Sequence, residues 1–299
     1  MQVQANGIPI EVEDTGGPGP AVLLVMGLGM QLIAWPDTLV RGLAQAGYRV
    51  IRHDNRDVGR SRIFDEARMP NLAWALLSQR LGLRVHAPYT LSEMAQDALG
   101  VLDALGVAQA HVVGASMGGM IAQRMAIAAP ERLLSLSSVM STSGARGLPG
   151  PRPEVARAML ARPRSSDRAA VLAHAVRFFQ LIGGSRFVVP ESELHARVAA
   201  ALARADHPRG VLRQLLAVMA DDTRAALLAR VKTPTLVIHG RDDPLVPLPG
   251  GEDTARRIAG ARLLVIDGMG HDLPAALVPQ LLPLLLEHFA RNPSSLLAA

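Results

Sequence analysis

The sequence contains no cysteine, which excludes disulfides, thiolate nucleophiles and cysteine-ligated metals. Aromatic residues make up only 3% of the chain, whereas hydrophobic residues make up 49%, so the core must consist mainly of Ala, Leu, Val, Ile and Met. Nucleic-acid surfaces that stack bases need aromatic side chains, and too few are present. The 299 residues are enough for one large core, as in a single α/β domain with an insertion.

Lysine is nearly absent as well, since Lys232 is the only one. The formal net charge of +5 comes from arginines scattered along the chain, which form no basic stripe of the kind that binds nucleic acid. No apolar run reaches the roughly eighteen residues of a membrane span. Residues 1–12 lack the basic and apolar regions of a secretory signal. We therefore expect a cytoplasmic protein that binds neither nucleic acid nor a membrane; its oligomeric state is not predicted.

Short apolar runs alternate with helical patterns along most of the chain. The run Ala21–Met26 is too short for a helix and is typical of a strand buried on both faces. Residues 35–46 then have helical spacing and lead to a second strand at residues 49–52. This alternation predicts a mostly parallel sheet flanked by helices. Near the start, Asn6-Gly7 splits an alternating stretch and predicts an antiparallel hairpin at the edge of that sheet.

The pattern changes after residue 142. A stretch rich in Gly and Pro is followed by amphipathic helices predicted around residues 170–182, 191–204 and 210–220, with no strand between them. Strands return at residues 235–239 and 262–266, and an apolar helix closes the chain. We predict an α/β core of residues 1–142 and 226–299 and a helical cap of residues 143–225.

A Gly-x-Ser-x-Gly sequence stands between a predicted strand and a predicted helix, with Ser116 at its centre. In a nucleophile elbow the serine occupies a sharp, strained turn, which is tolerated only when the residues two positions away on each side are small. Gly114 and Gly118 meet this requirement. The alternative is a plain glycine turn, but the strand before it and the helix after it favour the elbow.

Two further residues complete a serine-hydrolase set. A serine hydroxyl is a poor nucleophile near neutral pH, so Ser116 needs a base and a third group that orients the base. Asp243 follows the strand predicted to end at residue 239, and His271 follows the strand predicted to end at residue 266. The carboxyl ends of parallel strands share one edge of a sheet. We therefore predict Ser116, His271 and Asp243 as nucleophile, base and orienting acid.

Several stretches together resemble the α/β-hydrolase superfamily over residues 22–286, and within it the bacterial esterases of the anthracycline-methylesterase type. Five stretches carry the resemblance: the loop after the first buried strand together with the later pair Trp35-Pro36, Asp54 to Ser61, the elbow, His239 to Pro244, and Gly268 to His271. It implies the α/β-hydrolase fold with a helical cap, and esterase activity without a cofactor. The family pattern Gly-x-x-Asp places the acid at Asp243 and not at Asp242.

The sequence departs from the family at two positions. Met26 stands where a histidine is usual, which affects the hydrogen bonding of the loop after the first buried strand. Asp57 stands where many members have glycine.

Two backbone N–H groups are expected to bind the oxyanion of a tetrahedral intermediate. One belongs to Met117, directly after the nucleophile at a helix N-terminus. The other belongs to Leu28, where Gly27 and Gly29 allow close approach of the backbone. The alternative for this loop is an ordinary strand-to-helix turn. The side chains that bind the rest of the substrate are not predicted.

The remaining histidines give no metal site. His53, His111 and His239 lie in or at the end of predicted buried strands and are expected to be core or rim groups with satisfied hydrogen bonds. Histidines in the predicted cap helices are expected on solvated faces. No pair has convincing metal spacing with a carboxylate, and no loop has the sequence of a phosphate-binding loop. We predict neither metal nor cofactor.

These observations favour a serine hydrolase that cleaves small-molecule carboxylic esters through an acyl-enzyme intermediate. Carbon-carbon bond hydrolysis, perhydrolysis and acyl transfer use the same three residues and stay open as alternatives. A ligand receptor with little turnover is an alternative from a different class. The natural substrate is not predicted, because cap side chains shape the pockets.

Overall fold

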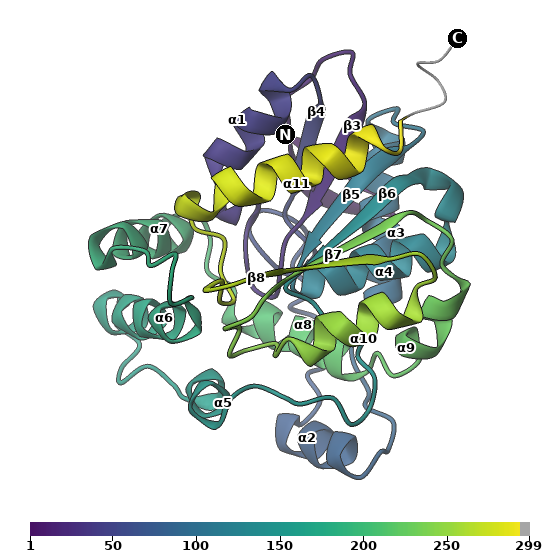
Figure 1. Cartoon of the computed structure of the whole chain (residues 1–299). Coiled ribbons are helices and arrows are strands. Elements are labelled where there is room, and N and C mark those ends of the chain that lie inside the picture. Colours follow the sequence, from purple (N-terminus) through teal and green to yellow (C-terminus); the bar gives the residue numbers. More distant parts are fainter. Residues whose placement is uncertain (294–299) are drawn as a thin grey trace.

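The computed structural model describes residues 1–293 and contains an eight-stranded sheet in the order β1-β2-β4-β3-β5-β6-β7-β8 (Figure 1). All neighbours from β4 to β8 pair in parallel, and β1 and β2 add an antiparallel edge. The predicted mostly parallel α/β fold is therefore confirmed. The strands are β1 (Gln2–Ala5), β2 (Ile8–Asp14), β3 (Ala21–Val25), β4 (Arg49–His53), β5 (Ala110–Ala115), β6 (Leu133–Val139), β7 (Thr235–Gly240) and β8 (Arg262–Ile266).

The predicted edge hairpin is confirmed. The turn between β1 and β2 consists of Asn6 and Gly7, which have φ values of 50° and 77°. A two-residue hairpin turn with positive φ at both positions matches the right-handed twist of the strands that it joins.

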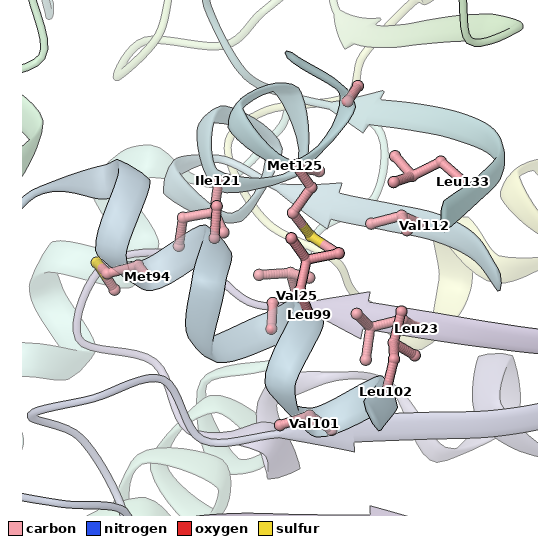
Figure 2. Close-up of a cluster of buried hydrophobic side chains, with 14 of the residues drawn as sticks. Leu23, Val25, Met94, Leu99, Val101, Leu102, Val112, Ile121, Met125 and Leu133 are labelled. Carbon is pink, nitrogen blue, oxygen red and sulfur yellow. The ribbon is translucent and has the colours of Figure 1, made fainter. Parts of the chain in front are cut away.

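The sheet lies between two layers of helices. On one face lie α1 (Asp37–Gln45) and α11 (Val278–Ala290), and on the other lie α3 (Leu91–Ala104) and α4 (Met117–Ala128). Strand β3 shows why both layers form: Leu23 and Val25 belong to the α3 and α4 cluster (Figure 2), whereas Val22 and Leu24 belong to the other cluster. All its residues are buried, as predicted for a strand covered on both faces.

Helices also fill the chain between β6 and β7. They are α5 (Pro153–Leu160), α6 (Arg168–Ile182), α7 (Glu191–Arg204), α8 (Pro208–Met219) and α9 (Arg224–Leu227). Helices α6 and α7 lie side by side and share a small apolar cluster of Val176, Leu194 and Val198 (Figure 1). The division into a core and a cap of residues 143–225 stays a prediction, and residues 294–299 of the predicted core lie outside the described residues.

Some helices were not predicted from the sequence. Helix α10 (Pro249–Arg257) begins Pro-Gly-Gly, and glycine is a poor helix former, so local propensity hides a helix that packing against β7 stabilises. Helix α5 is short and follows a stretch of Gly and Pro that suggested only a loop. Helix α2 (Leu72–Arg80) lies in the segment between β4 and α3. No helix in residues 1–293 is long and apolar enough to cross a membrane.

The three strand histidines are all buried, but two of them have buried ring nitrogens without a hydrogen-bond partner. His111 Nδ1 lies 2.8 Å from Ser135 Oγ, and His239 Nε2 lies 2.8 Å from the Val246 carbonyl oxygen. Within residues 1–293, neither ring nitrogen of His53 has a hydrogen-bond partner, and His239 Nδ1 also lacks one, so the expectation of satisfied hydrogen bonds was wrong at His53 and only half met at His239. Burial lowers the pKa of His53 to about 4, which keeps its ring neutral at pH 7.

Candidate functional site

Ser116 occupies a strained turn between β5 and α4. Its φ of 56° and ψ of −121° put it in a region that non-glycine residues rarely adopt. The backbone is held on both sides: Ser116 N–H donates to the Val139 carbonyl at 2.9 Å, and Ser141 Oγ donates to the Ser116 carbonyl at 2.8 Å. These bonds to β6 and the residues after it fix the direction of the serine side chain.

The glycines flanking Ser116 are required by space. A Cβ on Gly118 would lie 1.9 Å from the Val25 carbonyl oxygen, and a Cβ on Gly114 would lie 2.2 Å from the Gly118 carbonyl oxygen. Both obstacles are backbone atoms, which cannot rotate away. The close approach of α4 to β3 and β5 therefore depends on both glycines.

His271 and Asp243 extend the site away from the serine. His271 Nε2 lies 2.8 Å from Ser116 Oγ, and His271 Nδ1 lies 2.7 Å from Asp243 Oδ2. The Asp243 side chain is fully buried, and its Oδ1 accepts hydrogen bonds from the Leu245 N–H at 2.9 Å and the Val246 N–H at 2.8 Å. A carboxylate fixed in this way orients the imidazole, which is then placed to take a proton from the serine hydroxyl.

Asp242 lies outside this chain of hydrogen bonds. Its carboxylate accepts a hydrogen bond from the Ser185 hydroxyl, and its N–H donates to the Met269 carbonyl at 3.2 Å. The structure therefore places one of the two neighbouring aspartates against His271 and turns the other towards the segment after α6.

The loop after β3 lies directly over the serine. A Cβ on Gly27 would lie 3.1 Å from Ser116 Cβ, so glycine allows this approach. Within residues 1–293, the N–H groups of Leu28 and Met117 have no hydrogen-bond acceptor. At Met26, where the family usually has histidine, the backbone carbonyl accepts a hydrogen bond from Asn55 Nδ2 at 2.9 Å. The loop is therefore held through its backbone and does not depend on that histidine.

Two cavities meet at Ser116. One, of about 530 Å³, is lined by His271 and by side chains of α6 and α7 such as Phe178, Phe179 and Leu194. The other, of about 600 Å³, is lined by Met117, Met120 and the segment 142–151. Asp272 lines the first cavity, and burial raises the pKa of its carboxyl to about 6. The described residues contain no group of three His, Asp or Glu side chains that could hold a metal ion.

Two polar residues near the site were missed in the sequence. Asn55 holds the Met26 carbonyl, and Gln214 of α8 accepts a hydrogen bond from the Gly29 N–H at 2.8 Å. Gln214 is fully buried although it lies in a helix with mostly apolar neighbours. For Gln214, the only signal in the sequence was that a polar side chain stands on the apolar side of a predicted amphipathic helix.

Comparison with known proteins agrees with this architecture. The sequence profile described as alpha/beta hydrolase fold matches residues 20–274. Rhodomycin D methylesterase DauP of Streptomyces sp. (strain C5) is 34% identical over 284 residues, covering 88% of this chain and 89% of that protein. The 2-hydroxy-6-oxononadienedioate/2-hydroxy-6-oxononatrienedioate hydrolase of Burkholderia vietnamiensis is 28% identical, covering 91% and 88%.

A solved structure gives the same fold. The meta-cleavage product hydrolase CumD of Pseudomonas fluorescens IP01 superposes with a TM-score of 0.75 at 19% sequence identity, and the match covers 98% of both chains. The resemblance to anthracycline methylesterases inferred from the motifs is confirmed by the relatives, which support a hydrolase. The chain belongs to the alpha/beta hydrolase fold family.

Proposed function

We propose that the protein is a serine hydrolase that cleaves carboxylic esters without a cofactor, with Ser116 as nucleophile, His271 as general base and acid, and Asp243 as the orienting carboxylate. The observation that carries this proposal is the unbroken chain of two hydrogen bonds, 2.8 Å and 2.7 Å long, that joins a strained serine to a buried carboxylate through one histidine. The methylesterase relatives support the same reaction class.

Ser116 Oγ attacks the ester carbonyl carbon while His271 Nε2 takes the hydroxyl proton. The carbonyl oxygen becomes an oxyanion, which the N–H groups of Leu28 and Met117 stabilise. His271 gives its proton to the leaving oxygen, the carbon–oxygen bond breaks, and the alcohol departs. Water then attacks the acyl-enzyme while His271 takes its proton. The bond between the acyl carbon and Ser116 Oγ breaks, His271 returns the proton to Oγ, and the acid leaves.

The two cavities suggest where the halves of the ester bind. The leaving oxygen must lie near His271 Nε2, and His271 lines only the cavity of about 530 Å³. Met117, an oxyanion donor in this proposal, lines only the cavity of about 600 Å³. We therefore place the alcohol portion in the first cavity and the acyl portion in the second.

An active-site label tests the proposal. A fluorophosphonate should add one label per chain at Ser116, because among the serines of residues 1–293 this one alone combines a strained turn with a histidine in hydrogen-bond reach. Intact mass and peptide mapping locate the label, and Ser116→Ala should take up none. A label on another serine, or esterase activity retained in Ser116→Ala, would contradict the mechanism.

Carbon-carbon bond hydrolysis is the second candidate, and a hydrolase of 2-hydroxy-6-oxo dienedioates among the relatives favours it. Product analysis with a vinylogous diketone separates it from ester cleavage. Steady turnover of simple esters would show an enzyme and exclude a ligand receptor with little turnover.

We expect neutral, apolar esters to be better substrates than highly charged ones. The first cavity is lined mainly by apolar cap side chains, among them Phe178, Phe179 and Leu194, and a charged group placed there would lose its hydration. Specificity constants for neutral short-chain esters should exceed those for esters that carry a carboxylate or an ammonium group. Arg197 and Asp272 also line this cavity. If charged esters were the better substrates, the expectation would be wrong, and these two charged side chains would be the ones that select the substrate.

A further inference from the structure

The loop that carries Leu28 is held in place by a side chain from another part of the chain. Gln214 Oε1 accepts a hydrogen bond from the Gly29 N–H at 2.8 Å, and Gln214 Nε2 donates to the Arg56 carbonyl at 2.7 Å. Gln214 is fully buried, so no water competes for these bonds. Since one end of the amide meets a donor and the other an acceptor, its orientation is fixed.

This contact acts one residue away from the Leu28 N–H. The Gly29 N–H lies in the same peptide plane as the Leu28 carbonyl, so a bond to Gln214 fixes that plane beside the proposed oxyanion donor. Gly29 has a φ of 69°, and its Cα faces Val211 of α8 so closely that an added Cβ would lie 3.1 Å from that side chain. Helix α8 therefore limits the loop both by a hydrogen bond and by contact.

A buried ion pair sets the position of α8. Arg213, next to Gln214, donates from Nε to Asp57 Oδ2 at 2.7 Å and from Nη2 to Asp57 Oδ1 at 2.7 Å, and both side chains are fully buried. A Cβ on Gly210 would lie 2.1 Å from the Asp57 carbonyl oxygen, so the start of α8 is pressed against the same residue. These two parallel bonds fix both the distance and the angle between α8 and the loop after β4, which contains Asp57.

The ion pair accounts for the departure of the sequence at residue 57. Asp57 has a φ of 68°, a conformation that glycine adopts without strain. Glycine would remove both bonds from Arg213 and leave the buried Arg213 with only its longer contact to the exposed Asp65, whose Oδ1 lies 3.3 Å from Nη2. The Asp57 carboxylate also accepts the Phe64 N–H at 2.8 Å. The strained aspartate is therefore tied to the cap helix that carries Gln214.

We propose that Gln214 is a positioning residue for the oxyanion loop, anchored by the Arg213–Asp57 ion pair, and that the cap thereby sets the geometry in which the Leu28 N–H meets the transition state. The proposal rests on the proposed function, because it assigns the oxyanion to this loop. Its effect belongs to the transition state, so kcat should respond more strongly than KM.

The test compares Gln214→Met with Gln31→Met. Gln31 is also a buried glutamine that joins the cap to the core: its Nε2 donates to the Ala201 carbonyl at 2.8 Å and to the Ala205 carbonyl at 2.9 Å. Its side chain makes no hydrogen bond to residues 27–29, so it serves as the control. Gln214→Met should lower kcat for a neutral ester by about ten-fold to a hundred-fold with KM within about three-fold, whereas Gln31→Met should keep kcat within about three-fold.

A second readout separates positioning from general destabilisation. An aryl trifluoromethyl ketone forms a hemiketal whose oxyanion occupies the same place, so its inhibition constant should rise in Gln214→Met by the factor by which kcat/KM falls. Gln214→Glu keeps an acceptor for the Gly29 N–H, so it should recover part of kcat relative to Gln214→Met. If the methionine variant does not fold, Gln214→Glu takes its place in the comparison with Gln31→Met, because it loses the donor to the Arg56 carbonyl and should therefore still have a lower kcat than the parent protein.

The outcomes distinguish this proposal from the proposed function. If the parent protein hydrolyses esters at Ser116 but Gln214→Met loses no more kcat than Gln31→Met, the positioning role is wrong and the function stands. An unchanged inhibition constant for the trifluoromethyl ketone in Gln214→Met also overturns the positioning role. If the parent protein shows no esterase activity and no label at Ser116, the proposed function itself fails.

Discussion

Asp243→Asn should lower kcat for ester hydrolysis at least about a hundred-fold, and by up to about ten-thousand-fold if this site behaves as serine proteases do. Asp243 Oδ1 accepts two backbone N–H groups, from Leu245 and Val246. The asparagine carbonyl oxygen must therefore face these donors, which turns its NH₂ group towards His271 Nδ1. Nδ1 can then only accept, so the proton moves to Nε2 and His271 can no longer take the proton from Ser116.

Asp242→Asn is the matched control, and it should stay within about ten-fold of the parent. Asp242 is adjacent in sequence and carries the same chemical change, but its side chain bonds to Ser185. Kinetics on both purified variants decide the matter, with folding checked by circular dichroism. If Asp242→Asn lost more kcat than Asp243→Asn, Asp242 would be the orienting acid. If both variants showed only mild losses, the orienting acid would have to lie outside this loop.

The sequence predicted the parts of the fold that depend on local pattern. Strand β3 was recognised because every residue in it is apolar and the run is too short for a helix. The elbow was recognised because a sharp turn between strand and helix leaves a fixed pattern of glycines. Helix α10 was missed because its first residues have poor helix propensity, which tertiary contacts override.

The candidate site was predictable only in part for a related reason. Ser116, Asp243 and His271 each follow a strand, and in a parallel sheet that position alone brings them to one edge. Gln214 and Gly29 are 185 positions apart, and no rule of local pattern says which residue of α8 meets which loop. Asp57 was visible in the sequence as a charged residue at a position where glycine is usual, and such a residue needs a partner. The sequence did not identify Arg213 as that partner.

Gly118→Ala should disable the site through sterics alone. The added Cβ would lie 1.9 Å from the Val25 carbonyl oxygen and close to the Met26 carbonyl, so α4 must move away from β3. Overpacking against backbone costs about 1–3 kcal/mol of unfolding free energy, or more where nothing can relax. The same movement displaces Ser116 and the Met117 N–H, and a displacement of about 1 Å near reacting atoms can cost about a hundred-fold in rate.

Gly150→Ala provides the control, because a Cβ at Gly150 meets nothing within 4 Å. It should change the free energy of unfolding by no more than about 0.5 kcal/mol. Because Gly150 lines the cavity of about 600 Å³, this variant is a control for stability only, and the kcat of Gly118→Ala is compared with that of the parent protein. Urea unfolding and ester kinetics on both variants measure the two effects separately. We expect Gly118→Ala to lose both stability and kcat, since the helix that carries the Met117 N–H is the element displaced. A Gly118→Ala protein as stable as Gly150→Ala and as active as the parent protein would show that α4 can shift without moving Ser116, and the close approach of α4 to β3 would then have no role in presenting the serine.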